Sequence, residues 1–312
     1  MRIKINKLLP VITIITSLLL IIIISSQAQA ARTKLPRVVI DYKFDDARDF
    51  HEGLAAVYSK EDEAWGYVNN LGQMAIPFRL KIPEAGDFSD GLAFVGDRYI
   101  DTAGNPAFDD KLFENGREFV RGRAAVQSGG RWGYIDMTGK FAIAPIFEDA
   151  KSFSPVENLA PVKVNGLWGF INTEGVIKIP AQFASANSFS EGLALVEHSG
   201  RFGYIDTQGR LIIKFKYHEG GDFKYDLAPV RLKSNYRSWG YINKQGKIRI
   251  AHRYNMALNF ANGCAPVATD GRWGFINSVG EKIISNLYDE ARPFSEGLAA
   301  VRIDDKWGYI RQ

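Results

Sequence analysis

The chain has 312 residues and a formal net charge of +4, but three of its basic residues (Arg2, Lys4 and Lys7) stand within the first seven positions. Without them the numbers of basic and acidic residues are nearly equal, so the chain lacks the clustered positive charge that indicates nucleic-acid binding. Its single cysteine, Cys264, excludes an intrachain disulfide, and stability must come from packing.

Residues 1–30 have the pattern of a secretory signal peptide. The basic start is followed by an apolar run from Leu8 to Ile24, and Ala28 and Ala30 then form the small-x-small pattern that signal peptidase recognises. We expect cleavage after Ala30, which places the protein in the periplasm, the cell envelope or the extracellular space. The alternative is an uncleaved membrane anchor, because the apolar run has 17 residues and lies at the short limit of a membrane span.

After a leader at 31–37, residues 38–312 are dominated by one recurring motif. Trp-Gly followed by Tyr or Phe begins at Trp65, Trp132, Trp168, Trp239, Trp273 and Trp307, and Phe202-Gly203-Tyr204 fills one gap. A spacing of about 34 residues indicates a repeat architecture, in which units that cannot bury their own faces stack on one another. These seven positions are predicted to be structural, holding the units together.

Each unit carries two further signatures. A Phe-x-x-Gly-Leu-Ala segment, as at Phe189–Ala194, precedes the Trp-Gly strand and predicts a turn followed by a strand. An Asx-x-x-Gly segment, as at Asn172–Gly175, follows it and predicts a type I turn that leads into a third strand. The fold class predicted is therefore all-β, with eight tandem three-stranded antiparallel meanders. Glycine within the Trp-Gly strand is expected to admit an aromatic ring from the neighbouring unit.

The Trp-Gly-aromatic strand and the preceding Phe-x-x-Gly-Leu-Ala segment resemble those of the WG-repeat family of bacterial proteins. The resemblance covers residues 38–312, the whole chain after the leader. It implies a β-repeat scaffold used for interaction, and it brings no general catalytic residues with it.

The two ends of the repeat region bear on its overall arrangement. The last unit stops after Trp307–Gln312 without a third strand, whereas Val38–Ile40 has the register of a third strand that lacks its own hairpin. The two ends can complete one composite unit and close a propeller-like toroid, which removes exposed sheet edges. The alternative is an open superhelical array of the same units.

Residue types that carry catalysis are scattered. His51, His198, His218 and His252 lie in different units without zinc-like spacing. The paired acids, among them Asp45-Asp46 and Asp109-Asp110, fall in predicted turns. We therefore expect no catalytic residues, no metal and no cofactor.

Three departures from the repeat are the candidate binding residues. Asp97 and Arg98 stand where the second unit should have Trp-Gly, which indicates either decay of the repeat or a notch for a partner. Arg123 occupies a position that is usually Leu, where it either reaches to the surface or contributes to an anionic site. An insertion places Tyr236 and Arg237 at a hairpin tip.

These observations predict an exported, non-catalytic β-repeat scaffold that binds a protein or a cell-envelope glycan. One alternative is a hydrolase or lyase that acts on polysaccharide from a propeller-like face. Another is a purely structural component of the envelope. Nucleic acid is not expected as a partner, and a membrane is expected to be contacted only through the N-terminal signal or anchor.

Overall fold

The computed structural model describes residues 36–109, 111–232 and 238–312. Residues Pro36–Gln312 form one compact unit, and the predicted signal peptide lies outside the described residues. Within the described part of the chain, no helix has the length and apolar character needed to cross a bilayer. The described residues form strands and connecting turns, which confirms the all-β prediction.

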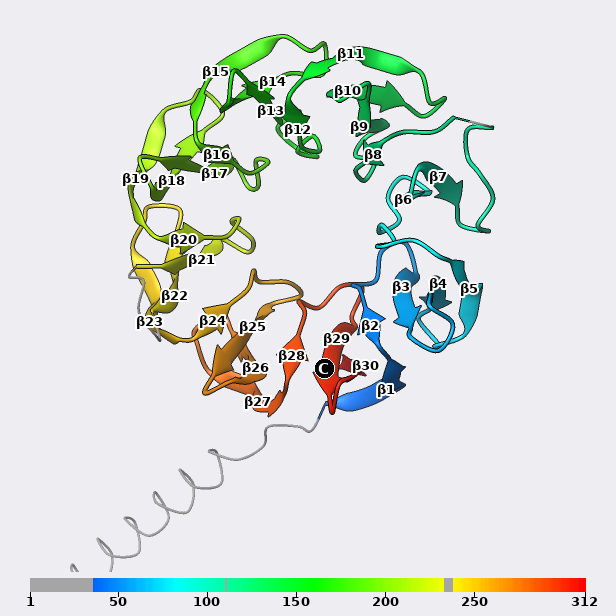
Figure 1. Cartoon of the computed structure of the whole chain (residues 1–312). Coiled ribbons are helices and arrows are strands. Elements are labelled where there is room, and N and C mark those ends of the chain that lie inside the picture. Colours follow the sequence, from blue (N-terminus) through cyan, green and yellow to red (C-terminus); the bar gives the residue numbers. More distant parts are fainter. Residues whose placement is uncertain (1–35, 110, 233–237) are drawn as a thin grey trace, which may run out of the picture. The chain divides into compact units, whose positions relative to one another are not determined.

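The strands form seven four-stranded antiparallel sheets, or blades, and one two-stranded sheet. Figure 1 shows them arranged in a ring, with two-residue strands innermost and seven- or eight-residue strands mostly at the periphery. The strands of each blade are named from the innermost to the outermost. The first blade in the chain consists of β2 (Asp46–Ala47), β3 (Leu54–Ser59), β4 (Ala64–Asn69) and β5 (Met74–Leu80). The next two consist of β8 (Asn115–Gly116), β9 (Arg123–Ser128), β10 (Arg131–Asp136) and β11 (Phe141–Phe147), and of β12 (Asp149–Ala150), β13 (Ala160–Val164), β14 (Leu167–Ile171) and β15 (Ile177–Phe183).

The two-stranded sheet, β6 (Leu92–Val95) with β7 (Arg98–Asp101), lies between the first and second of these blades in the chain. Two further blades consist of β16 (Ser185–Ala186), β17 (Leu193–His198), β18 (Arg201–Asp206) and β19 (Leu211–Tyr217), and of β20 (Glu219–Gly220), β21 (Leu227–Arg231), β22 (Trp239–Asn243) and β23 (Ile248–Tyr254). Another consists of β24 (Met256–Ala257), β25 (Cys264–Thr269), β26 (Arg272–Asn277) and β27 (Lys282–Tyr288). The last consists of β28 (Glu290–Ala291), β29 (Ala299–Ile303), β30 (Lys306–Arg311) and β1 (Arg37–Phe44).

The prediction of eight units with three strands each holds only in part: seven units form four-stranded blades, and the remaining one, β6–β7, has two strands. The additional strand is the innermost one, such as Asp149–Ala150, which pairs with Lys163 and Val162 of β13. Two residues are too few to show the alternation of apolar and polar side chains by which a strand is recognised in a sequence. The three longer strands of each complete blade are those that the repeat signatures predicted.

The first strand of the chain completes the last blade. β1 pairs with β30, with Val38 opposite Ile310 and Phe44 opposite Trp307. Across the same seam, the Lys306 ammonium donates to Asp45 at 2.7 Å. The prediction of a composite unit is therefore confirmed, and the closed propeller arrangement excludes the open superhelical array.

The glycine of each Trp-Gly strand makes room for backbone rather than for an aromatic ring, so that expectation was wrong. A Cβ at Gly169 would lie 2.6 Å from the carbonyl oxygen of Ile179 on the outer strand of the same blade. The register explains this contact, because Trp168 pairs with Phe183 while Phe170 pairs with Ile179. Four residues of β15 therefore face two of β14, and the excess bulges across the glycine.

Adjacent units are joined mainly by the aromatic residue that follows this glycine. The Tyr134 ring packs against Phe153 of the next blade with centroids 4.8 Å apart, and its hydroxyl donates to the Lys151 carbonyl at 2.9 Å. The same ring contact recurs in the pairs Tyr67–Phe88, Tyr99–Phe119, Phe170–Phe189, Tyr204–Phe223, Tyr241–Phe260, Phe275–Phe294 and Tyr309–Phe50. Aromatic packing thus continues around the ring.

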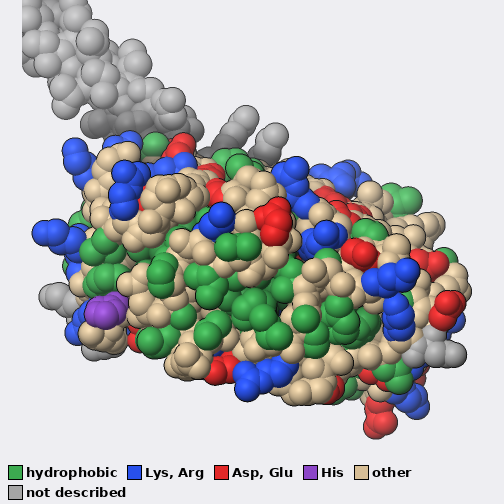
Figure 2. Space-filling model, turned by 90° about the horizontal axis from the view of Figure 1, so that it is seen from above, with side chains coloured by type: hydrophobic (Ala, Val, Ile, Leu, Met, Phe, Trp, Pro, Cys, Tyr) green, Lys and Arg blue, Asp and Glu red, His purple; other side chains and the backbone are tan. Residues whose placement is uncertain are grey.

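The tryptophans of the motif lie in the blades' cores. Trp65, Trp132, Trp168, Trp239 and Trp307 are buried, whereas Trp273 and Phe202 are half-buried. Cys264 is also fully buried, as expected of a cysteine that replaces leucine. By contrast, hydrophobic side chains gather on the side of the molecule seen in Figure 2. Several hydrophobic residues of the outer strands are exposed, among them Phe141, Ile146, Ile177 and Leu211.

Candidate functional site

The β6–β7 unit lacks the outer part of a blade. Beyond β7 only a single bridge, between Ile100 and Pro106, stands where other units have a long outer strand. The rings of Phe94, Phe108, Phe113 and Phe119 all lie within 6.1 Å of the Tyr99 ring, measured between centroids. Aromatic side chains thus replace the missing strand as the packing of this unit.

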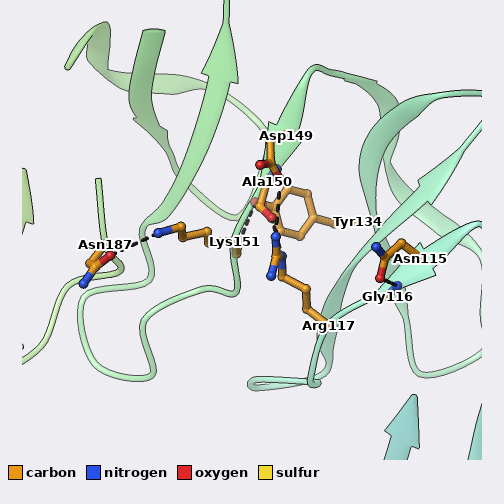
Figure 3. Close-up of polar contacts among 8 residues, drawn as sticks. All are labelled: Asn115, Gly116, Arg117, Tyr134, Asp149, Ala150, Lys151 and Asn187. Carbon is orange, nitrogen blue, oxygen red and sulfur yellow. Dashed lines mark hydrogen bonds and ion pairs between the residues drawn. The ribbon is translucent and has the colours of Figure 1, made fainter. Parts of the chain in front are cut away.

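In most units, the residue after the innermost strand reaches toward the next unit. Figure 3 shows Arg117 donating from Nε to the Ala150 carbonyl at 2.7 Å, with Nη2 3.4 Å from the Asp149 carboxylate. Lys151 donates to the Asn187 side-chain oxygen at 3.0 Å. Arg48–Glu84 and Arg292–Asp46 are the corresponding ion pairs near the seam. This repeat position therefore links neighbouring units at the inner face in five units, whereas Gly221 and Leu258 occupy it in the β20–β23 and β24–β27 blades.

Gly86 occupies that position in the β6–β7 unit, so no side chain makes the link. A Cβ at Gly86 would lie 2.7 Å from the carbonyl oxygen of Phe94, which leaves no room for one. A cavity of about 750 Å³ opens here, and we call it the recess. Its charged lining residues are Arg48, His51, Glu84, Asp87, Glu114, Arg117 and Glu118.

Two carboxyl groups at and beside the recess are held in poorly hydrated positions. Burial raises the pKa of Asp87, whose Oδ2 lies 3.7 Å from Nε2 of His51, and the nearby His51 and Arg48 only partly oppose the shift. Burial likewise raises the pKa of Asp49 to about 6; Arg292 opposes this shift, and the charge of Asp87 adds to it. Both acids stand two residues after an innermost strand position, in adjacent units.

The guanidinium groups at the recess lie over aromatic rings. Arg48 lies 5.9 Å from the centroid of Trp65, and Arg117 lies 4.9 Å from that of Trp132. Each cation is thereby held against its own blade. The recess is a polar, mixed-charge site with more carboxylates than cations, suited to a ligand that donates hydrogen bonds or carries positive charge. No group of three or more His, Cys, Asp or Glu within the described ranges could hold a metal ion.

Of the predicted binding residues, Asp97 and Arg98 directly follow Gly96 of the recess lining, and neither they nor Arg123 line the recess. Arg98 Nε donates to the Asp97 carboxylate at 2.8 Å; Asp97 is exposed, whereas Arg98 is half-buried. The backbone carbonyl of Asp97 accepts from Phe113, so this turn supports the aromatic cluster. Arg123 begins β9 half-buried and donates to the Gly122 carbonyl at 3.1 Å. Tyr236 and Arg237 lie outside the described residues.

The paired acids considered for catalysis have other contacts. Asp45 accepts from the Lys60 backbone at 2.8 Å as well as from Lys306, and Asp46 pairs with Arg292 at 3.5 Å. Asp109 lies in the loop after β7, and Asp110 lies outside the described residues. Asp45 and Asp46 therefore contribute to joining the first and last units.

Sequence reasoning missed Asp87, His51 and Glu118. An alignment of the units on their recurring Phe sets Gly86 against Arg48, Arg117 and Lys151. It also sets Gly221 at the same position in a complete blade, so the missing side chain alone does not single out the recess.

Together, the ring of blades, its strand-exchanged seam and the closely similar repeats define a β-propeller built from tandem repeats. The chain belongs to the family described as "WG containing repeat", whose family model matches residues 34–60, 65–96, 132–168, 168–201, 202–236, 239–273 and 273–307. Residues 97–131, which include part of the recess, lie outside these matches.

Solved structures resemble the fold at low sequence identity. A structure titled as the eukaryotic initiation factor matches with a TM-score of 0.58 and 10% identity, over 89% of this chain and 85% of that one. A virginiamycin B lyase from Staphylococcus aureus matches with a TM-score of 0.46 and 13% identity, over 90% and 96%. PorZ of Porphyromonas gingivalis, a bacterial surface component of the type-IX secretion system, matches with 0.45 and 8%, over 88% and 38%. The first supports the propeller arrangement alone. No curated protein sequence matches the chain.

Proposed function

We propose that the protein is an exported, non-catalytic scaffold that binds a partner protein of the cell envelope through the recess. The observation that carries the proposal is the recess itself, a cavity of about 750 Å³ located at Gly86, where the linking side chain that Arg48 and Arg117 supply in the two adjacent units is absent. Its volume lies in the range of ligand-binding cavities. A lysine or arginine side chain of a partner is the group that best suits its lining.

The charges of the recess support this choice of partner. Glu84, Asp87, Glu114 and Glu118 outnumber Arg48 and Arg117 in the lining. The Asp87 carboxylate is partly desolvated, which raises its pKa and makes its ionised form costly without a partner. A cationic side chain that enters the recess would relieve this cost, because an opposite charge at close range favours the ionised form.

The test is recovery of the partner with matched variants at one repeat position. The purified protein is cross-linked to the envelope fraction, and the captured proteins are identified and quantified for wild type, Asp87→Asn and Asp222→Asn. Asp222 stands at the position of Asp87 in the β20–β23 blade, and burial raises its pKa as well. We expect Asp87→Asn to lose the partner and Asp222→Asn to keep it. Capture of the same proteins by all three would contradict the proposal.

Export is part of this proposal and has its own test. The basic start, the apolar run and Ala28–Ala30 support cleavage after Ala30. N-terminal sequencing of the protein from fractionated cells is expected to begin at Ala31. A membrane-bound chain that retains residues 1–30 would instead establish the anchor.

A second candidate function is a hydrolase or lyase acting on polysaccharide. The observation that favours it is Asp87 beside His51, because a carboxyl group with a raised pKa next to an imidazole suits general acid–base chemistry. Turnover of envelope polysaccharides that is lost in Asp87→Asn but kept in Asp222→Asn would support this function. Equal rates in all three would exclude it.

A further inference from the structure

A second site lies on the β20–β23 blade, where the loop between the two innermost strands departs from the repeat. Four other units have an acidic residue followed by glycine there, and the acid accepts a backbone N–H of the next unit; these acids are Glu52, Asp90, Glu191 and Glu296. Glu52 accepts from Gly91, and Glu296 accepts from Gly53, each at 2.9 Å. In the β20–β23 blade the corresponding residues are Tyr225 and Asp226.

Tyr225 makes the same link with its hydroxyl. The phenolic oxygen accepts from the Asn262 backbone N–H at 3.0 Å, while the Tyr225 backbone donates to Glu191 of the preceding blade at 2.8 Å. The side chain is therefore held at both ends, yet it is 54% exposed. A ring fixed in this way is a rigid surface on which a ligand can stack with little loss of side-chain entropy.

The backbone at this loop has a left-handed residue other than glycine at a position where most units have glycine. Tyr225 has a φ of +55°, as Glu52 (+53°) and Glu296 (+52°) have at the same position, but Asp226 adopts +59° where those loops have glycine. The left-handed conformation costs about 1–2 kcal/mol for such residues. Strain of this kind gathers at functional sites. At Asp226, the strained conformation places a carboxylate at the position where most units have glycine, and this carboxylate pairs with Lys244.

The Asp226 carboxylate holds the ammonium group of Lys244 in the same cavity that Tyr225 lines. Lys244 Nζ lies 2.9 Å from Asp226 and 3.3 Å from Glu191. The corresponding turn position is Thr173 in the β12–β15 blade and Thr207 in the β16–β19 blade. An ammonium group that two carboxylates hold in place presents both donors and acceptors beside the exposed ring.

These groups line a cavity of about 460 Å³, together with Asn243, Gln245, Arg249 and Val279. Val279 is 70% exposed and adds an apolar wall from the next blade. The cavity thus combines a fixed aromatic surface, an apolar edge and several amide, ammonium and carboxylate groups. A pyranose ring matches this combination, because its C–H face is apolar and its rim carries hydroxyl groups that both donate and accept.

From this arrangement we infer that the Tyr225 cavity binds a sugar residue of a glycan chain, which stacks on the tyrosine ring and hydrogen-bonds to Lys244 and Asp226. The site is separate from the recess, and it does not depend on the partner proposed there.

The experiment is titration with hexasaccharides of glucose and of N-acetylglucosamine, in α- and β-linked forms, monitored by saturation-transfer NMR and calorimetry. The informative variant is Tyr225→Glu, which restores the residue that Glu52 and Glu296 supply in their own loops, and so keeps the link to the next unit. An Asp87→Asn variant controls for the recess. We expect at least one saccharide to bind wild type and Asp87→Asn equally, and Tyr225→Glu to lose about tenfold in affinity, the equivalent of one aromatic contact.

Binding that survives in Tyr225→Glu would overturn the inference, as would the absence of saturation transfer from every hexasaccharide. The melting temperature of Tyr225→Glu must match or exceed that of wild type, which shows that the loop is intact. Tyr225→Phe provides a second measure, since it keeps the ring but removes the contact with Asn262; an intermediate affinity is expected.

Discussion

The complete blades and the β6–β7 unit use the same inner framework but differ in their outer halves. In the β12–β15 blade the outer strand bulges across Gly169, and the Trp-Gly motif is intact. In the β6–β7 unit Arg98 stands at the glycine position, and only a single bridge, at Pro106, replaces the outer strand. Yet Tyr99 still contacts Phe119 of the next unit, as Tyr134 contacts Phe153.

This difference separates two requirements on the motif. The aromatic residue maintains contact between units and is kept in both regions. The glycine is required only where an outer strand crosses it, so its loss and the loss of that strand belong together. The interrupted unit preserves the ring while opening the recess on its inner face.

The strongest test of this distinction is a methyl group at Gly169. Because its Cβ would lie 2.6 Å from the Ile179 carbonyl and 2.7 Å from the Ala181 nitrogen, Gly169→Ala must displace the outer strand. We expect a loss of about 3 kcal/mol in the free energy of unfolding, at the upper end of typical overpacking costs. Urea denaturation monitored by tryptophan fluorescence measures it.

Two control variants complete this test. Gly53→Ala places a methyl group in open space at a φ of +78°, so backbone strain alone should cost about 1 kcal/mol. The reverse change Arg98→Gly, in the unit without an outer strand, should cost no more than about 1 kcal/mol. If Gly169→Ala were as mild as these two, the outer strand would not be the reason for the motif.

A smaller effect on the free energy of unfolding is expected from Asp49, the buried acid beside the recess. Since the folded state raises the pKa of Asp49 to about 6, above its usual value near 4, the folded protein binds this proton more tightly than the unfolded chain does. Its contribution to stability is therefore complete below about pH 4 and is lost as the pH rises through about 6.

Asp49→Asn removes this dependence. Relative to wild type, the variant should gain about 2 kcal/mol in the free energy of unfolding between pH 4 and pH 7. Ser188→Ala, at the same repeat position in a complete blade, should show no such trend. Denaturation curves at both pH values measure the difference, and parallel behaviour of all three proteins would show that Asp49 is not desolvated.

The smallest effect concerns Arg123, which begins β9 immediately after the interrupted unit. Leu193 and Leu298 fill the corresponding positions in other blades and are buried, whereas the Nε of Arg123 is buried without a hydrogen-bond partner. Arg123→Leu should therefore stabilise the protein by about 1 kcal/mol. A lower melting temperature in this variant would show that the arginine is needed where it stands.

Much of the fold could be predicted because the repeat signals it many times over. Alternating apolar residues and Asx-x-x-Gly turns revealed the three long strands, and the position of Val38–Ile40 revealed the composite blade. The innermost strands could not be seen, because strands of two residues have no period. The purpose of the glycine was also missed, because a bulge such as that of β15 over Gly169 depends on register between strands, which one strand's sequence does not contain.

The sequence identified the unit that contains the candidate site but not the residues of the site. Asp97 and Arg98 pointed to the correct unit, but the recess lies at Gly86, eleven residues before Asp97, and Gly221 stands at the same repeat position in a complete blade. The Tyr225 cavity was hidden for a different reason. Tyr225 and Asp226 belong to a looser copy of the Phe-x-x-Gly-Leu-Ala segment, and the hydrogen bond that the Asn262 N–H donates to the tyrosine hydroxyl cannot be recognised in the sequence.

The seam between β1 and β30 has a consequence for the order in which the molecule forms. Lys306 and Asp45, which meet there, are 261 positions apart. Contacts so distant along the chain carry a large loop-closure cost and form slowly. Blades made of consecutive strands can form during synthesis, but the blade that contains both β1 and β30 forms only after β30 has been made. Until β1 and β30 pair, their facing edges are unpaired. Ring closure is therefore the step before which a nascent chain is most vulnerable to pairing with another chain.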